Sequence, residues 1–181
     1  IVTVRVSRPT PPGDANFYSA PNTWPASGAT VSIKYTLSQS KSRPVSSIRA
    51  YYSVNGGGKW LPAVAASGTI STHLATSPTG ITYTYNWDVF ASGFFGQSDN
   101  VVFRIEAITD VGTPKNGIPG PFLYGRNASA TFPFRVRGTQ VRVLQGNQPA
   151  RNALVYRQPA GSSATAQPIA SLAGEPFNTD A

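Results

Sequence analysis

The stretch from Ile48 to Pro62 (IRAYYSVNGGGKWLP) constrains the fold more than any other part of the sequence. Its first half alternates apolar and polar side chains, which is typical of a strand with one buried face. Asn55 and three glycines follow, and glycine accepts the positive φ angles that a tight reversal requires. Pro62 has no N–H to donate, so we expect the return strand at a sheet edge. Because a lone hairpin is marginally stable in water, a second layer must cover its apolar face.

The same alternation recurs along the chain, and no segment shows a 3.6-residue apolar period over ten or more residues. We therefore predict an all-β fold, an antiparallel immunoglobulin-like β-sandwich. Trp87 is expected to point into its core, and Pro133 to lie at an edge or bulge. Besides the two arms of the hairpin, the predicted strands are Ile1–Val6, Val31–Leu37, an edge strand within Ser67–Gly80, Ile81–Trp87, Asn100–Thr109 and Ser129–Val136.

A domain boundary is expected near Arg137-Gly138. Residues 1–137 would form the sandwich, and residues 138–181 a short, incomplete C-terminal β-module. Its predicted strands are Thr139–Leu144, Ala153–Arg157 and Pro168–Leu172, with a turn between the first two. These strands hold too few apolar residues to close a core. The tail is therefore expected to dock on the sandwich, or to be completed by another chain or by further residues.

Composition limits the chemistry that the chain can perform. Fifteen Lys and Arg against seven Asp and Glu give a net charge of +8, but the positive charges are spread singly. This pattern disfavours nucleic acid as a partner and leaves an anionic polysaccharide or cell envelope open. No apolar window is long enough to span a membrane. The sequence begins inside an apparent strand without Met or a signal peptide, and we interpret it as a piece of a longer polypeptide.

Catalytic residue types are scarce. There is no cysteine, and His73 is the single histidine, so thiol chemistry and transition-metal sites lack ligands. Asp88 and Asp99 flank one connector and could form a glycosidase pair, or hold calcium together with Asn100. Capping of turns is the commoner role of such residues. We predict no enzymatic activity, no cofactor and no metal.

Two groups of side chains are candidates for binding. Aromatic residues in loops can stack on sugars or anchor a protein partner, and they can equally plug the ends of a sandwich. Basic residues on the solvent faces of strands can form a face for an anionic glycan, or simply keep the strands soluble. The aromatic candidates are Trp24, Phe94, Phe95 and Tyr124, and the basic ones are Lys34, Arg49, Arg104 and Arg135.

The two ends of the chain are candidates for self-association. Ile1–Val6 is an alternating strand with nothing ahead of it, and Val2, Val4 and Val6 share one face with no evident cover. Strand addition from a neighbouring copy or module would satisfy Ile1 and these three valines, and a head-to-tail contact would propagate into a filament. The alternative is that both ends fold back on their own sandwich.

Residues 1–137 resemble the immunoglobulin-like or fibronectin-type-III-like modules of large bacterial surface and secreted proteins. Tyr51–Trp60, Thr82–Asp88 and Ser98–Ala107 carry this resemblance. The tail is similar to the opening of carboxypeptidase-regulatory-like (transthyretin-like) modules, through Val141–Arg157 and Phe177–Ala181. Both resemblances imply multi-domain exported proteins that serve as stalks, adhesins, sheaths or filaments.

One further similarity points elsewhere. Ser53–Trp60 is close to the Asp-box of sialidase-type propellers, with Asn55 in place of the acid, but it occurs once and not once per blade. This similarity therefore does not indicate a propeller.

Taken together, the resemblances and the scarcity of catalytic residues predict a non-catalytic, extracellular or cell-surface structural or adhesive module, a subunit of a filament, sheath or adhesin stalk. The alternative is a carbohydrate-binding accessory module of an exported enzyme.

Overall fold

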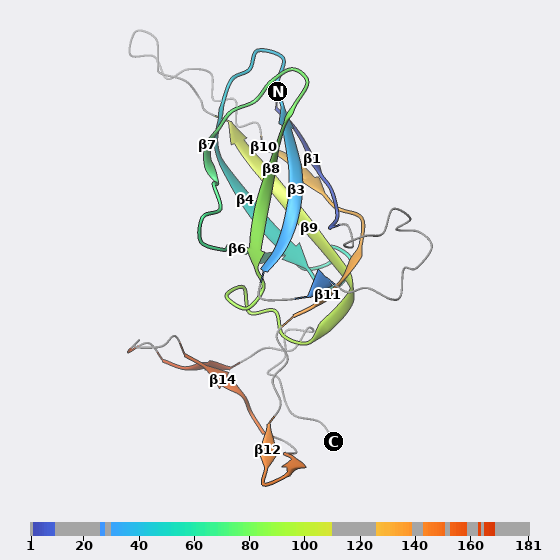
Figure 1. Cartoon of the computed structure of the whole chain (residues 1–181), viewed down its shortest axis with the longest axis vertical. Coiled ribbons are helices and arrows are strands. Elements are labelled where there is room, and N and C mark those ends of the chain that lie inside the picture. The colour runs from blue at the N-terminus through green and yellow to red at the C-terminus, as the bar shows by residue number, and fades with distance from the viewer. Residues whose placement is uncertain are drawn as a thin grey trace.

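The chain folds into two packed β-sheets, followed by two small hairpins beyond one end of the sandwich (Figure 1). None of the residues that the structure describes lies in a helix, so the predicted all-β sandwich is confirmed. The structure is a computed structural model that describes residues 2–9, 26–27, 30–109, 126–138, 143–150, 153–158, 163 and 165–168.

The smaller sheet has four antiparallel strands in the order β1-β3-β8-β6. At its centre, β3 pairs with β8 in a register that sets Ile33 opposite Tyr85. Both residues are buried, because alternate side chains of each strand point toward the other sheet. The strands are β1 (Thr3–Val6), β3 (Thr30–Ser38), β8 (Ile81–Asp88) and β6 (Val64–Ala65).

The larger sheet has the order β2-β11-β9-β4-β5, and β10 pairs with β9 while β7 pairs with β4. All pairs are antiparallel except β2 with β11. The predicted hairpin is the β4–β5 pair, and Pro62 lies at the sheet edge as expected. The strands are β2 (Ala26–Ser27), β4 (Val45–Ser53), β5 (Leu61–Pro62), β7 (Thr72–Leu74), β9 (Gln97–Thr109), β10 (Arg126–Ala130) and β11 (Phe134–Arg137).

The single strand predicted over Ser129–Val136 is wrong, because the chain breaks there into β10 and β11. Both strands pair with β9, and Thr131 lies in the break between them. The Thr131 amide donates to the Phe103 carbonyl at 2.8 Å, and the Thr131 hydroxyl accepts from the Phe103 amide at 3.0 Å. The side chain thus replaces a backbone acceptor of the ladder. Pro133, which has no N–H, is accommodated in this irregular segment.

The turn between β4 and β5 is closed by side chains rather than by the backbone alone. Ser53 Oγ accepts from the Gly57 amide at 2.9 Å, and Asn55 Oδ1 accepts from the Lys59 amide at 2.9 Å. Gly56 and Gly57 have φ of 71° and 103°, which side-chain-bearing residues rarely adopt. Asn55 therefore stabilises the turn, a structural role.

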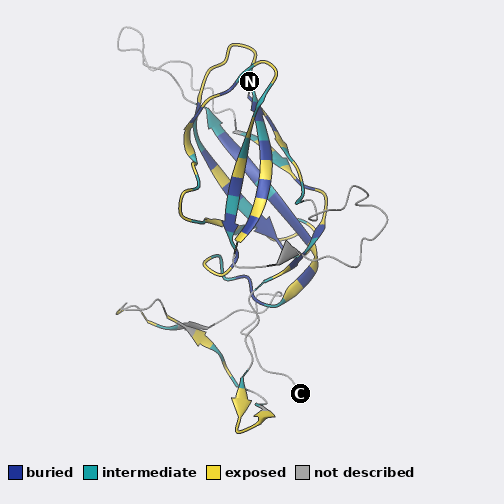
Figure 2. Ribbon diagram, in the orientation of Figure 1, coloured by how far each residue is buried: buried dark blue, intermediate teal, exposed yellow. Residues whose placement is uncertain are grey.

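The buried residues lie along the strands of the two facing sheets (Figure 2). The largest of their fully buried side chains are aromatic. Trp87 is fully buried, as predicted, and its ring centroid lies 4.9 Å from that of Tyr52, 5.4 Å from that of Phe103 and 5.7 Å from that of Phe94. The indole N–H donates to Ser92 Oγ at 2.8 Å, so the single polar group of Trp87 is satisfied inside the core.

Two hairpins with two-residue strands follow the sandwich. β12 (Leu144–Gln145) pairs with β13 (Gln148–Pro149), and β14 (Tyr156–Arg157) pairs with β15 (Gln167–Pro168). The predicted turn after Leu144 thus contains a strand, and the strand predicted over Ala153–Arg157 is shorter than expected. Of the strand predicted over Thr139–Leu144, residues 139–142 lie outside the described residues, and Leu144 begins β12. The strand predicted over Pro168–Leu172 lies outside the described residues beyond Pro168.

Candidate interaction surface

The outer face of the larger sheet, the side turned away from the smaller sheet, gathers most of the charged side chains that the sequence singled out. On β4, Arg49 and Tyr51 alternate with buried residues, and on β9 Arg104 and Glu106 do the same. The register sets Arg49 opposite Glu106 and Tyr51 opposite Arg104. Side chains that are directly opposite on one face of a sheet are in reach of each other.

Arg104 is the centre of this face. Its guanidinium carbon lies 4.3 Å from the ring centroid of Trp60 and 5.0 Å from that of Tyr51. Its Nη2 lies 3.2 Å from Glu106 Oε1, and Glu106 is nearly buried. Arg104 therefore ties the hairpin turn that carries Trp60 to the central strand β9, through cation–π contacts and an ion pair. The guanidinium occupies one face of the Trp60 ring, so that face is not a free platform for a sugar.

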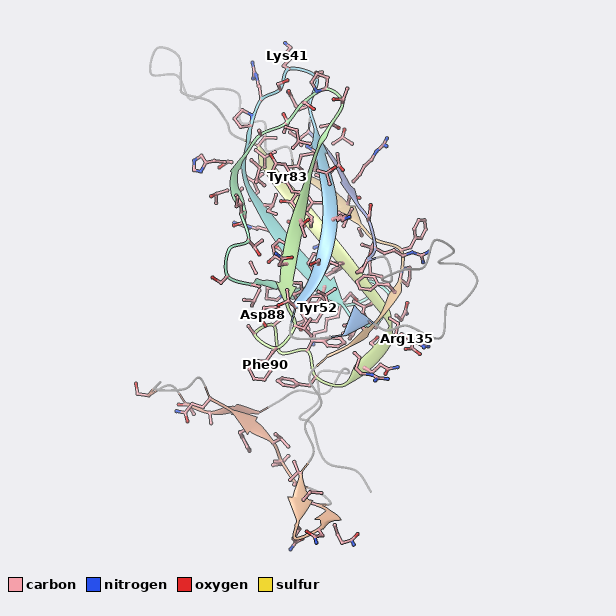
Figure 3. The ribbon with its side chains drawn as sticks, viewed as in Figure 1. Lys41, Tyr52, Tyr83, Asp88, Phe90 and Arg135 are labelled. Carbon is pink, nitrogen blue, oxygen red and sulfur yellow. The ribbon has the colours of Figure 1, made fainter. Side chains whose placement is uncertain are left out.

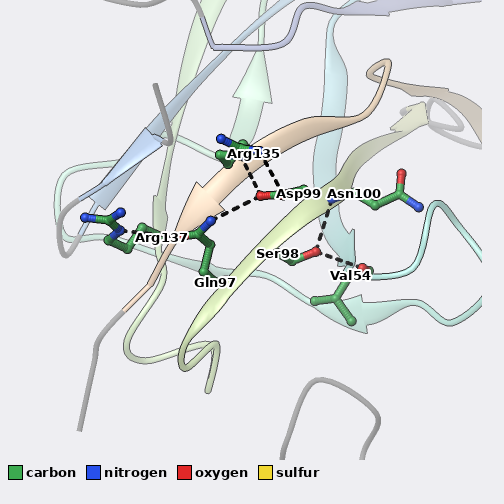
Figure 4. A network of polar contacts seen from close by, with 7 residues as sticks. All are labelled: Val54, Gln97, Ser98, Asp99, Asn100, Arg135 and Arg137. Atoms are coloured by element: carbon green, nitrogen blue, oxygen red, sulfur yellow. Dashed lines mark hydrogen bonds and ion pairs between the residues drawn. The ribbon is translucent and has the colours of Figure 1, made fainter. Parts of the chain in front are cut away.

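A second ion pair lies at the other end of the same strand. Arg135 of β11 donates through Nη2 to Asp99 Oδ2 at 2.8 Å, and the Gln97 amide donates to Asp99 Oδ1 at 3.2 Å (Figure 4). These hydrogen bonds, that of Arg135 above all, lower the pKa of Asp99. Arg137 donates to the Gln97 side chain at 3.3 Å and extends the polar row.

The predicted basic face is therefore divided between two sheets. Arg49, Arg104 and Arg135 belong to the larger sheet, but Lys34 lies on β3 of the smaller one. On the larger sheet, Glu106 and Asp99 each pair with an arginine. Among the side chains that the structure describes on its strands, Arg49 and Arg137 supply the remaining positive charge. The face carries a modest surplus of positive charge and is not a concentrated basic patch.

The N-terminal strand differs from the expectation of an uncovered apolar side. Val2 and Val4 belong to the hydrophobic core and Val6 packs partly against it, while β1 pairs with β3 of its own chain. β1 also lies against β10 of the other sheet. The apolar side of this strand is therefore covered by its own sandwich. Ile1 lies outside the described residues.

The loop aromatics fall into two groups. Phe94 and Phe95 are buried, and Phe94 belongs to the core, so both act as plugs at the end of the sandwich. Trp24 and Tyr124 lie outside the described residues. Sequence reasoning missed Phe90, which is 49% exposed and lies at the same end, near Asp88 (Figure 3).

The candidate catalytic residues have structural roles. Asp88 Oδ1 accepts from the Ala91 amide at 2.8 Å and so caps the turn after β8, the role expected from turn chemistry. Asp99 is held by Arg135, and His73 is exposed on the short edge strand β7. Among the described residues, no three His, Cys, Asp or Glu side chains come close enough to hold a metal ion.

Glu106 and Trp60 are the functional-looking residues whose role the sequence did not predict. The spacing of Arg104 and Glu106 indicates a common strand face, but the link to Trp60 depends on the pairing of β9 with β4 and on the path of the turn. No local pattern encodes such a long-range contact.

Fold and surface together define the class: a two-layer, mostly antiparallel β-sandwich domain in which the outer face of one sheet carries paired charges. No family model, curated protein or solved structure matches the chain. Over the part of the chain that the structure describes, no helix has the length and apolar character needed to cross a membrane.

Proposed function

We propose that this chain is a non-catalytic structural or adhesive module of an extracellular or cell-surface assembly. One observation carries the proposal: the carboxylates in the part of the chain that the structure describes are used to hold the sandwich together. Asp88 caps a turn, Asp99 pairs with Arg135, and Glu106 pairs with Arg104. A catalytic acid or base needs a substrate-accessible site and a pKa matched to its task. Residues committed to such contacts serve stability instead.

The partners that we propose are further copies of the chain or neighbouring modules of the same assembly. The Ser7 amide donates to the Lys34 carbonyl of β3. Because bonded and non-bonded pairs alternate along an antiparallel ladder, the backbone groups of Val4 and Val6 point away from β3. Strand addition at β1 would use these groups. The packing of β1 against β10 and the charge of Arg5 both restrict that edge. Contacts between sandwich ends and faces are therefore the favoured mode of assembly.

Sedimentation velocity of the purified chain over a hundredfold range of concentration tests the proposal. An assembly module should form larger particles as the concentration rises, without added ligand. Its hydrolytic activity on glycans, peptides and esters should equal that of a buffer blank. Hydrolytic turnover that disappears in Asp88→Asn or Asp99→Asn would refute the proposal and indicate a glycosidase instead.

Binding of an anionic polysaccharide is the second candidate, and the surplus of positive charge on the outer face of the larger sheet favours it. Because Arg104 already occupies one face of Trp60, recognition would rely chiefly on the charge of Arg49 and Arg137. Binding of this kind weakens as the salt concentration rises.

Affinity electrophoresis in gels that contain alginate or neutral dextran separates the two candidates. A polysaccharide-binding module should be retarded by alginate alone, and Arg49→Ala should remove more of this retardation than Lys34→Ala. Lys34 is the matched control because it carries the same charge on the other sheet. Equal effects of the two substitutions would show that alginate binds through the net charge of the chain and not through a specific face.

A further inference from the structure

The turn between β4 and β5 holds Asn55-Gly56, the one Asn-Gly sequence within the part of the chain that the structure describes. The amide nitrogen of a residue can attack the side-chain carbonyl carbon of a preceding asparagine, and glycine has no Cβ to hinder the approach. A C–N bond forms and closes a succinimide ring, the Cγ–Nδ2 bond breaks, and ammonia leaves with the amide proton. Water then opens the ring at either carbonyl and yields aspartate or isoaspartate. Asn55 is exposed, so solvent reaches this turn.

The folded turn engages both of the groups that would react. The Gly56 amide, the nucleophile, donates to the Asn100 carbonyl of β9 at 3.0 Å. The Asn55 carboxamide, the electrophile, accepts through Oδ1 from the Ser53 hydroxyl at 2.8 Å and from the Lys59 amide at 2.9 Å. The two donors polarise the carboxamide and would by themselves assist attack, but the attacking nitrogen is turned toward β9. Ring closure therefore requires these hydrogen bonds to break.

Two buried serines hold the turn in this arrangement. Ser53 Oγ also accepts from the Gly57 amide at 2.9 Å. Ser98 Oγ donates to the Val54 carbonyl at 2.9 Å and accepts from the Asn100 amide at 3.2 Å, so it fixes β9 beside the turn (Figure 4). Ser53 and Ser98 thus determine how readily the turn opens.

We propose that Asn55 is a site of spontaneous deamidation, and that opening of the turn between β4 and β5 controls its rate. Each opening releases the Gly56 nitrogen and the Asn55 carboxamide together. Three hydrogen bonds are lost on opening, and at the usual net strength of such a bond the open turn is about a hundredfold rarer than the closed one. The proposal does not depend on the proposed function, since any protein built on this turn would carry the site.

The two products differ in their effect on the turn. Aspartate at position 55 keeps an oxygen in the place of Oδ1 and retains both of its hydrogen bonds. Isoaspartate routes the main chain through the side chain and lengthens the backbone, which moves Trp60 relative to β9. The contact between Trp60 and Arg104 is then lost, so isoaspartate at position 55 alters the outer face of the larger sheet.

Peptide mapping of the full chain by mass spectrometry, after incubation at mildly alkaline pH in native buffer or in urea, tests the proposal. Trypsin cleaves after Arg49 and Lys59 and releases Ala50–Lys59, in which Asn55 is the single asparagine. Conversion of Asn55 should be about a hundredfold slower in native buffer than in urea, because it follows the population of the open turn. Equal rates would refute control by the turn, and absence of conversion in urea would refute the site.

A pair of variants separates opening of the turn from unfolding of the whole sandwich. Ser53→Ala removes two hydrogen bonds of the turn and should accelerate conversion in native buffer about tenfold. Thr76→Val is the matched control, because it removes a buried hydroxyl that donates to the Arg43 carbonyl. Arg43 precedes β4 and Asn55 follows it, so this hydrogen bond lies at the opposite end of the strand. Thr76→Val should leave the rate unchanged.

A second serine variant keeps the test decisive if circular dichroism shows that Ser53→Ala is unfolded. Ser98→Ala releases β9 from the turn and should also accelerate conversion. The proposal is refuted if Thr76→Val accelerates conversion as much as the folded serine variants do, since the reaction would then proceed through global unfolding.

Discussion

Replacement of Trp87 by alanine tests the packing of the sandwich most severely. The side chain has no exposed surface, and truncation of a buried Trp costs about 3–5 kcal/mol. Three ring contacts, with Tyr52, Phe103 and Phe94, place the expected loss at the upper end of that range. The lost hydrogen bond to Ser92 adds about 1 kcal/mol. Single domains are stable by only about 5–15 kcal/mol, so the variant is expected to lose at least about a third of its free energy of unfolding.

Urea unfolding followed by far-UV circular dichroism measures this loss without relying on the fluorescence of the deleted residue. Trp60→Ala is the matched control, because Trp60 is half-buried on the outer face of the larger sheet and contacts Arg104. It is expected to cost about 1 kcal/mol, the scale of one cation–π contact. Equal losses for the two variants, or a loss below about 1 kcal/mol for Trp87→Ala, would refute the assigned strand register.

Three further predictions concern ionisable and polar groups. Tyr85→Phe should cost about 1 kcal/mol in urea unfolding because the Tyr85 hydroxyl donates to the Ala63 carbonyl at 2.7 Å. Tyr35→Phe should be neutral or stabilising, since its buried hydroxyl has no hydrogen-bond partner among the described residues. Burial raises the pKa of Tyr85 to about 12 and that of Tyr35 further. The contribution of these two groups to the free energy of unfolding should therefore be complete below pH 10 and fall as the pH rises from 10 through 12. The double variant Tyr35→Phe/Tyr85→Phe should make that fall smaller. Arg135→Ala should raise the pKa of Asp99 toward its usual value in a carbon-13 NMR titration, and an unchanged pKa would remove Arg135 as the cause.

The strands were predictable where one face of the strand is buried and the other is exposed to solvent. Ile81–Trp87 and Ile48–Val54 show this alternation, and the structure places the first in β8 and the second, up to Ser53, in β4. The prediction over Ser129–Val136 is wrong because Thr131 satisfies the Phe103 amide with its side chain. Alternation alone cannot indicate that a side chain has replaced a backbone partner.

The surface was less predictable than the strands. Arg49 and Arg104 were assigned to the solvent faces of strands because each alternates with apolar residues, and both lie in the larger sheet. The contact of Arg104 with Trp60 and the packing of Phe94 against Tyr52 join residues that are distant in sequence. The residues that cover Val2 and Val4 likewise belong to the opposite sheet. The sequence alone therefore could not decide whether this strand folds back on its own sandwich or joins a neighbouring copy.

Electron microscopy of the source material, with gold-labelled antibodies against the purified chain, tests the central claim most directly. A structural or adhesive module of a surface assembly should label regular filaments, sheaths or stalks outside the cell, with a spacing set by the repeat of the module. Diffuse labelling of the cell interior, or label on single secreted particles that also bind and degrade a polysaccharide, would contradict the account.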